Sequence, residues 1–195
     1  MPEAGAAADQ GEAHETGPRR RRRWALFLGL AGAVVILDQL TKLWVDASFT
    51  EASRSIPAGQ PGGPTEILGE ILRIAKTYND GAIFGFLEAV APLMALLTLL
   101  VIAGLLWYEW RHGAATGPLM TVGLGLLLGG AIGNLIDRVR IGHVIDFVDM
   151  GFGSTRWYAW NIADAAVFVG ILTLFAAALL GDRARPWRRS RARPA

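Results

Sequence analysis

The stretch NIADAAVFVGILTLFAAALL, residues 161–180, decides how this chain must fold. It is long and apolar enough to cross a bilayer, since about 20 apolar residues span the hydrocarbon core. Yet it carries Asp164, with Asn161 one helical turn before it. A carboxylate in hydrocarbon costs about 2.5–3.5 kcal/mol even on lenient insertion scales. We therefore expect a transmembrane helix whose polar start meets other polar side chains.

Three further runs are long enough to cross a membrane, and the chain is 52% hydrophobic with a mean hydropathy of +0.35. This composition is too apolar for an ordinary soluble domain. The four expected spans are 24–45, 89–108, 118–137 and 160–180. In the outer segment 46–88, β-branched residues and a turn signal predict a small β-rich sheet. The expected fold class is an all-α membrane protein with four transmembrane helices and this extracytoplasmic sheet.

Positively charged residues are concentrated on one side of these spans. Twelve of the nineteen Lys and Arg residues fall in the N-terminal arm, the 109–117 loop and the C-terminal tail. The bias of basic residues toward cytoplasmic loops places both termini in the cytoplasm. We expect disordered basic tails at 1–23 and 182–195 around a transmembrane domain at 24–181. These arginines are expected to contact anionic lipid, not nucleic acid.

Two absences restrict the chemistry. The chain has no cysteine, which excludes disulfides, thiolate nucleophiles and cysteine-based metal sites. His143 has no ligand at metal-binding spacing, so we interpret it as structural and expect neither metal nor cofactor. The first span is not expected to be a cleaved signal peptide, because Asp38 and Lys42 interrupt its apolar run.

Polar residues of three spans share one depth, as the rise of about 1.5 Å per helical residue shows. They are Asp38, Lys42, Asn134, Asp137, Asn161 and Asp164. All of them fall in the outer third of the membrane. Asp38 and Lys42 are also four residues apart, so their side chains lie on one helix face and can form an ion pair. We therefore predict a polar layer in which Asp164 has polar neighbours.

The loop between the third and fourth spans contains HVIDFVD, an apolar run interrupted by carboxylates. We expect it to lie at the membrane interface and to return Asp146 toward the polar layer. Asp149 is interpreted as a charge on the rim. Asp137 precedes Arg138 directly, which favours an ion-paired structural carboxylate there. Small residues at Gly125, Gly129 and Gly133 are typical of close helix packing.

Two carboxylates held close together cannot both ionise cheaply, so one keeps a proton. Such a pair can activate water and polarise a carbonyl, which is acid–base hydrolysis of an amide. Three alternatives remain open from the residues alone: a proton or ion pathway, a Ser/Lys hydrolase, and a non-catalytic assembly subunit. The turn signal at 79–81 has two interpretations. In one, Gly81 supplies a positive φ and the Asn79 amide holds backbone or substrate. In the other, the segment is merely a hairpin turn.

Several motifs resemble those of the lipoprotein signal peptidases, also called type II signal peptidases. They are LDQLTK at 37–42, TYNDGAIFGF at 77–86, GGAIGNLIDR at 129–138, GHVIDFV at 142–148 and WNIAD at 160–164. The resemblance covers nearly all of the chain between the tails, in the family's order. It implies four transmembrane helices, a β-rich cradle outside the bacterial plasma membrane, and aspartic-protease chemistry at the outer leaflet. The implied substrate is a diacylglyceryl-modified prolipoprotein, cut just before the lipidated cysteine.

The same resemblance assigns the catalytic pair to Asp146 and Asp164. Further motif positions should shape the site or hold the substrate, and they are Asp38, Lys42, Asn79, Gly81, Asn134, Asp137, Arg138, Asn161 and Ala163. Trp160 stands where the family pattern suggests Phe, and Ile83 where it suggests a small residue, which bears on the width of the pocket. The expected partners are prolipoprotein substrates and membrane lipids, with the enzyme working as a monomer.

Overall fold

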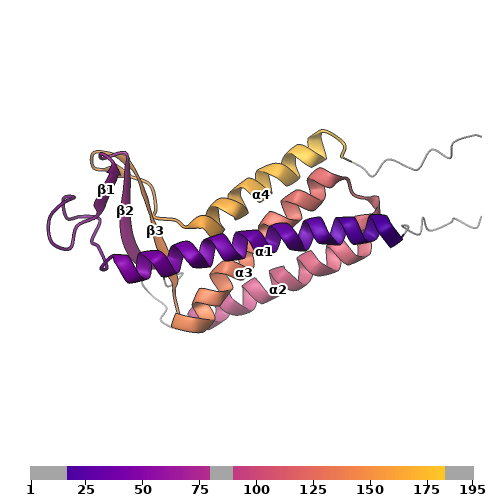
Figure 1. The fold of residues 1–195 in the computed structure, drawn as a ribbon, viewed down its shortest axis with the longest axis horizontal. Helices are drawn as coiled ribbons and strands as arrows, with labels where there is room; N and C mark the ends of the chain where they lie inside the picture. The colour runs from indigo at the N-terminus through magenta and orange to yellow at the C-terminus, as the bar shows by residue number, and fades with distance from the viewer. Residues whose placement is uncertain (1–16, 80–89, 183–195) are drawn as a thin grey trace, which may run out of the picture.

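The structure, a computed structural model, describes residues 17–79 and 90–182 and consists of a helix bundle with a small sheet at one end (Figure 1). Within these ranges, four helices are long and apolar enough to cross a membrane. They are α1 Gly17–Ser48, α2 Val90–His112, α3 Pro118–Ile141 and α4 Ile162–Leu179, and the short 3-10 helix η1 Gly113–Ala115 joins α2 to α3. The predicted fold class is confirmed.

Three helices extend beyond the expected spans, and among them α2 continues past 108 to His112. Helix α1 begins at Gly17, so the arginine run 19–23 is helical and not part of a tail. Pro18 fits there because the first turn of a helix needs no donor at that position. Helix α3 continues past 137 and ends at Gly142, whose φ of 83° is the left-handed conformation of a helix C-cap. Arg138 therefore lies in the last turn of α3 and not in a loop.

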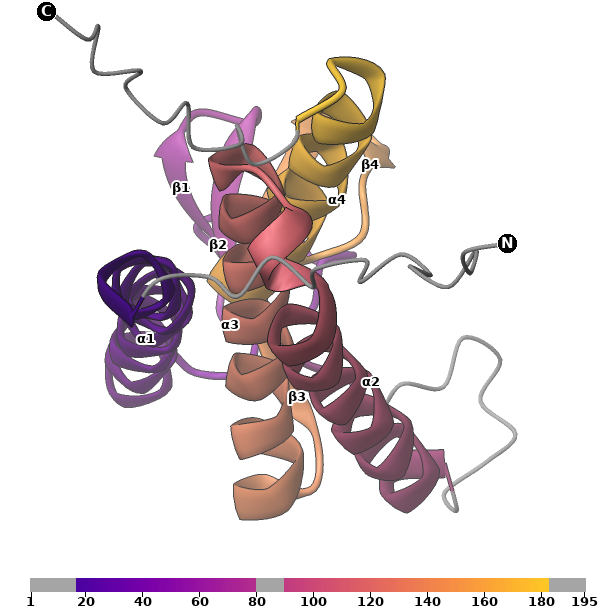
Figure 2. The ribbon, with the colours of Figure 1, turned by 90° about the vertical axis from the view of Figure 1, so that its right-hand side faces the viewer.

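Helix α3 lies at the centre of the bundle, between α1, α2 and α4 (Figure 2). Its glycines allow this close packing. A Cβ added at Gly129 would lie 2.6 Å from Cβ of Val34 on α1, and one added at Gly130 would lie 2.5 Å from the Ala163 carbonyl oxygen of α4. The predicted glycine stripe thus packs α3 against α1, and further glycines pack it against α4. This brings three polar helix segments within contact distance.

The sheet has the strand order β1-β2-β3-β4, and all pairs are antiparallel. Its strands are β1 Thr65–Leu68, β2 Leu72–Asn79, β3 Val144–Phe152 and β4 Thr155–Arg156. Strand β3 corrects the expectation of an interfacial loop at HVIDFVD. Its sequence VIDFVDMGF is rich in β-branched and aromatic residues, and β2 supplies the hydrogen-bond partners that a strand needs. Asp146 is therefore fixed by strand pairing, opposite Thr77.

A buried cluster of Val45, Ile145 and Phe147 attaches the sheet to the end of α1. In the opposite half of the bundle, a second cluster forms around Phe27 and Leu128. Large apolar side chains face outward along the helices: Leu100 is 60% and Phe175 is 65% exposed. Soluble monomers rarely expose such continuous apolar surface, whereas a lipid-facing bundle requires it.

Candidate active site

Polar side chains of α1, α3 and α4 meet at the end of the bundle that carries the sheet, as the shared depth predicted. Lys42 contacts three of these side chains. Its Nζ lies 2.8 Å from Oδ2 of Asp38 and 2.9 Å from Oδ2 of Asp137, and it donates to Oδ1 of Asn134 at 2.9 Å. The side chains of Lys42, Asp38 and Asp137 have no solvent exposure. The attraction of the two carboxylates and the hydrogen bond to Asn134 offset the cost of burying the ammonium.

The partner of Asp137 differs from the expected one. Arg138 forms no ion pair with Asp137; its guanidinium donates to the Asn134 carbonyl oxygen at 3.4 Å. The ion-pair partner of the Asp137 carboxylate is Lys42. The other contacts of Asp137 join separate elements. Its Oδ2 accepts the backbone N–H of Ile145 at 3.2 Å, and its Oδ1 accepts from Gln39 at 3.0 Å. Asp137 therefore positions the start of β3 against α3.

Gln39 was missed by the sequence interpretation. Its Nε2 donates to Asp38, to Asp137 and to the Gly133 carbonyl oxygen, at 3.2, 3.0 and 3.1 Å. The available signal was an amide inside an apolar span, next to Asp38. Asp38 also accepts the backbone N–H of Ala163 at 2.9 Å, and this satisfies one of the unpaired donors at the start of α4. Ala163 is fully buried, so its small side chain permits the close contact between α3 and α4.

Asp164 is tolerated in an apolar span because it forms part of the N-terminal cap of α4. Asn161 is the N-cap: its side chain accepts the Asp164 N–H at 2.9 Å, and Oδ2 of Asp164 accepts the Asn161 N–H at 3.3 Å. This reciprocal pair is a capping box, and the positive end of the helix dipole favours a carboxylate at this position. The remaining oxygen, Oδ1, accepts from Nδ2 of Asn134 at 2.8 Å.

Asp146 approaches from the sheet side and is only 2% exposed. Its Oδ1 accepts from Nδ2 of Asn161 at 2.7 Å, and its Oδ2 accepts from Nδ2 of Asn79 at 2.9 Å. Burial raises the pKa of Asp146 from 3.8 to about 6; the charge of Asp164 adds to this, while the hydrogen bonds from Asn79 and Asn161 oppose it. The amide of Asn79 thus holds a side-chain carboxylate, a partner that the sequence interpretation did not name.

Two asparagines connect the two carboxyl groups. Nδ2 of Asn161 contacts Asp146 and also lies 3.2 Å from Oδ1 of Asn134, whose Nδ2 in turn contacts Asp164. The carboxyls of Asp146 and Asp164 thus belong to one hydrogen-bonded network built from β3, α3 and α4. The two carboxyls also interact electrostatically, since the charge of Asp164 raises the pKa of Asp146.

Two other positions singled out in the sequence, Gly81 and His143, have different outcomes. Gly81 lies outside the described residues. His143 stacks against Tyr78 with ring centroids 4.2 Å apart, consistent with a structural role. In residues 17–79 and 90–182, no group of three or more His, Cys, Asp or Glu side chains could hold a metal ion.

The interpretation of Asp149 as a rim charge is wrong. Its carboxylate has no solvent exposure and lies between three arginines of the sheet region, namely Arg54, Arg73 and Arg156. Burial alone would raise the pKa of Asp149, but the hydrogen bonds from these arginines outweigh it and hold the pKa below its usual range. Arg156 is seven residues from Asp149, but Arg54 and Arg73 are 95 and 76 residues away, so the folded sheet region is needed to bring the cluster together.

This geometry defines a class of protein: a four-helix membrane protein with a carboxyl pair where its bundle meets a small antiparallel sheet. Comparison with known proteins gives the family. The family model described as signal peptidase (SPase) II matches residues 30–180. The chain belongs to this family of proteases and is a membrane protein.

Relatives and solved structures agree with the assignment. The lipoprotein signal peptidase of Syntrophomonas wolfei subsp. wolfei is 40% identical over 163 residues, covering 83% of this chain and 95% of the relative. That of Caulobacter vibrioides is 36% identical over 168 residues, covering 83% and 90%. A bacterial membrane enzyme solved by the in meso method at 2.3 Å is similar with a TM-score of 0.66 and 28% identity, over 79% of this chain and 87% of that one.

Proposed function

We propose that this protein is an aspartic endopeptidase that removes signal peptides from diacylglyceryl-modified prolipoproteins, cutting just before the lipidated cysteine. The observation that carries the proposal is the linked pair of carboxyls, Asp146 and Asp164. They come from different elements and are connected through Asn161 and Asn134. The family membership supports prolipoproteins as the substrate class.

In the proposed mechanism the two carboxyls share one proton. We assign that proton to Asp146, because its pKa is raised to about 6 and its protonated form is therefore populated at and below that pH. Protonated Asp146 donates a hydrogen bond to the scissile carbonyl, and ionised Asp164 removes a proton from the attacking water. The water oxygen forms a bond to the carbonyl carbon. Collapse of the tetrahedral intermediate then breaks the C–N bond, and the leaving nitrogen takes a proton from the pair.

The remaining residues hold this pair and the substrate. Asp38 holds the start of α4, Asp137 holds the start of β3, and Lys42 joins the two carboxylates. These three residues therefore position the catalytic pair and do not contact the reacting atoms. Arg138 has a different role. Its guanidinium is half-buried, and within the described residues its only hydrogen bond is the one to the Asn134 carbonyl oxygen. We assign Arg138 to holding carbonyl oxygens of the substrate near the pair.

Orientation in the membrane follows from the arrangement of the helices. The start of α1 and the end of α4 lie at one end of the bundle, and the sheet lies at the other (Figure 1). Together with the basic residues near the termini, this supports a bacterial plasma membrane protein with cytoplasmic termini and an active site on the extracytoplasmic side. A lipid-modified substrate in the outer leaflet would reach the site laterally, and we propose that a monomer suffices.

The alternatives are less well supported. An ion pathway needs polar groups across the whole bundle, but the half distant from the sheet contains the apolar cluster around Phe27 and Leu128. A Ser/Lys hydrolase needs a hydroxyl beside Lys42. The hydroxyl of Thr41 instead donates to the carbonyl oxygen of Leu37 in its own helix, at 2.8 Å.

The direct test is cleavage of a synthetic diacylglyceryl-modified peptide in detergent. We expect Asp146→Asn and Asp164→Asn each to reduce the rate by at least about 10³-fold, because each removes one proton-transfer group. Glu66→Gln is the matched control, since Glu66 is an exposed carboxylate on β1. The unlipidated peptide should be cut far more slowly. Substantial cleavage by either aspartate variant, with folding retained, would rule out the pair.

A further inference from the structure

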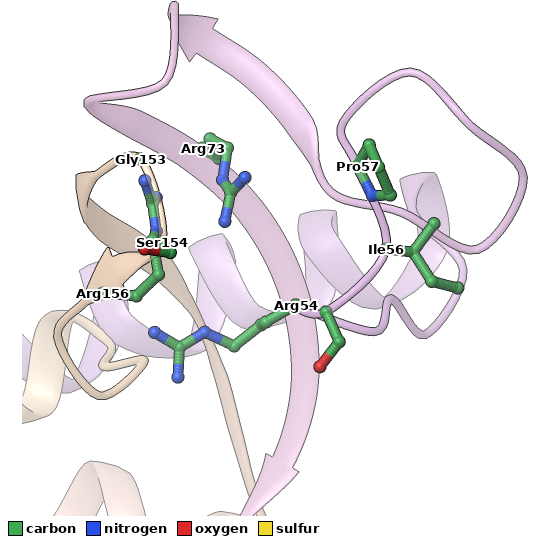
Figure 3. Close-up of a pocket in the computed structure, with 8 residues that line it drawn as sticks. Arg54, Ile56, Pro57, Arg73, Gly153, Ser154 and Arg156 are labelled. Atoms are coloured by element: carbon green, nitrogen blue, oxygen red, sulfur yellow. The ribbon is translucent and has the colours of Figure 1, made fainter.

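The sheet region holds a cavity that is separate from the carboxyl pair. Its volume is about 440 Å³. Its lining consists of the loop after α1, one residue of β2 and the β3–β4 turn, namely Arg54, Ser55, Ile56, Pro57, Arg73, Gly153, Ser154 and Arg156. Figure 3 shows that the three arginines reach this space from three different segments. The signal peptidase mechanism uses none of these side chains.

The cavity carries an excess of buried positive charge. Three guanidinium groups share one carboxylate, because Asp149 lies 2.8 Å from Arg54, 2.6 Å from Arg73 and 2.9 Å from Arg156. The side chains of Arg73 and Arg156 are only 9% and 10% exposed. The cluster therefore has a net charge of +2 in a partly desolvated space. Excess buried charge is costly unless an opposite charge accompanies it.

The arginines also retain donors for that opposite charge. Arg54 uses Nε and Nη2 on Asp149, with Nη2 also reaching the Trp157 carbonyl oxygen, and Arg73 uses Nε and Nη2 on Asp149. Within residues 17–79 and 90–182, Nη1 of Arg54 and Nη1 of Arg73 make no hydrogen bond. Glu66 pairs with Arg73 across the strands, but its side chain is exposed and forms no ion pair with it in these ranges. Guanidinium groups with unused N–H groups match the oxygens of a phosphate.

The surroundings of the cavity indicate where that phosphate comes from. The β3–β4 turn contributes Gly153 and Ser154 to the lining, and beside it Phe152, Trp157 and Tyr158 are 64%, 62% and 86% exposed. The rings of Phe152 and Trp157 pack edge to face, with their centroids 6.5 Å apart. Exposed aromatic side chains at the end of a membrane-spanning bundle are typical of the headgroup level of a bilayer. A phosphate at this level belongs to a phospholipid.

We propose that the cavity bounded by Arg54, Arg73 and Arg156 binds the phosphate of an anionic phospholipid headgroup. The lipid anchors the sheet to the outer surface of the membrane, beside the active site. This binding does not depend on peptidase activity, so it is tested by lipid binding and not by cleavage. An anionic headgroup is preferred because the net positive charge of the cluster repels the cation of a zwitterionic one.

The test measures binding of phosphatidylglycerol with six-carbon acyl chains to the full-length protein in detergent, by calorimetric titration. Wild type should bind one lipid saturably, and Arg54→Gln should weaken binding about tenfold, because it removes a charge-assisted hydrogen bond. Arg54 suits this test because its replacement leaves the ion pairs of Asp149 with Arg73 and Arg156 in place. Arg140→Gln is the matched control: Arg140 is exposed at the end of α3, outside the cavity, and its loss should leave binding unchanged.

A second variant keeps the test decisive if Arg54→Gln fails to fold. Ser154 is exposed at the cavity, so Ser154→Glu adds a negative charge there without disturbing the core, and it should abolish binding that Ser154→Gln retains. Four results would overturn the proposal. They are equal weakening by Arg140→Gln, unchanged binding by both cavity variants, equally tight binding of phosphatidylcholine, and equally tight binding of inorganic phosphate without the lipid.

Discussion

Asp146 and Asp149 are three residues apart on β3, and they differ in every respect except burial. Their exposed fractions are 2% and 0%. Because side chains alternate along a strand, an odd separation places them on opposite faces. Asp146 faces the asparagines of the helix bundle, whereas Asp149 faces the arginines of the sheet region. The pKa of Asp146 is raised to about 6, and that of Asp149 is lowered.

The difference teaches that burial does not decide the role of a carboxylate; its partners do. Neutral amides hold Asp146 in place without cancelling its charge, so its proton can be exchanged near neutral pH. Three cations surround Asp149 and keep it ionised, which makes it a structural anion. One strand thus carries a group suited to chemistry and a group suited to holding the fold.

The largest effect on stability is expected from Asp149→Asn. It leaves three guanidinium groups without their counter-charge, and we expect a loss of about 3 kcal/mol in the free energy of unfolding. Thermal unfolding in detergent measures it, with Glu66→Gln as an exposed control. Since the pKa of Asp149 is lowered, its contribution is present above the ordinary value of 3.8 and is lost as pH falls through the lower folded pKa. An unchanged unfolding temperature at pH 7 would contradict the structural role.

Asp146→Asn should act in the opposite direction on stability. The folded protein binds more protons than the unfolded chain between pH 3.8 and about 6, so wild-type stability falls as pH rises through that window. The asparagine variant lacks this loss. We expect it to be more stable than wild type at pH 7 by up to about 3 kcal/mol, with a difference of only about 0.5 kcal/mol at pH 4. A variant that is less stable at both pH values would show that the ionised carboxylate supports the fold.

The smallest effect is a shift in the pH profile of cleavage. The Asn79 amide donates to the Asp146 carboxylate and so opposes the rise of its pKa. In Asn79→Ala we expect the alkaline limb of activity to move upward by up to about one pH unit. Thr77→Val is the control, because the Thr77 hydroxyl contacts the backbone oxygen of Asp146 and not its carboxyl. A limb that moves equally in both variants would attribute the shift to strand distortion.

Much of the site could be predicted from local patterns. The i,i+4 spacing of Asp38 and Lys42 predicted their pair, and that pair is present at 2.8 Å. The shared depth of polar residues predicted that three helices meet in one layer, and Asn134 contacts residues of α1 and α4. The choice of Asp146 over Asp137 came from the family resemblance, since composition treats the two alike. In the structure Lys42 pairs with Asp137, whereas the carboxyl of Asp146 accepts hydrogen bonds from the neutral amides of Asn79 and Asn161.

By itself, the sequence determined the helices, the polar layer and the glycine contacts, because each depends on a repeat of a few residues along one helix. The tertiary structure alone decided that HVIDFVD is a strand, that Lys42 and not Arg138 neutralises Asp137, and that Asp149 is enclosed by arginines. Those outcomes depend on partners up to about a hundred residues away in the chain. Strand pairing and charge neutralisation are set by proximity in space, which no local pattern records.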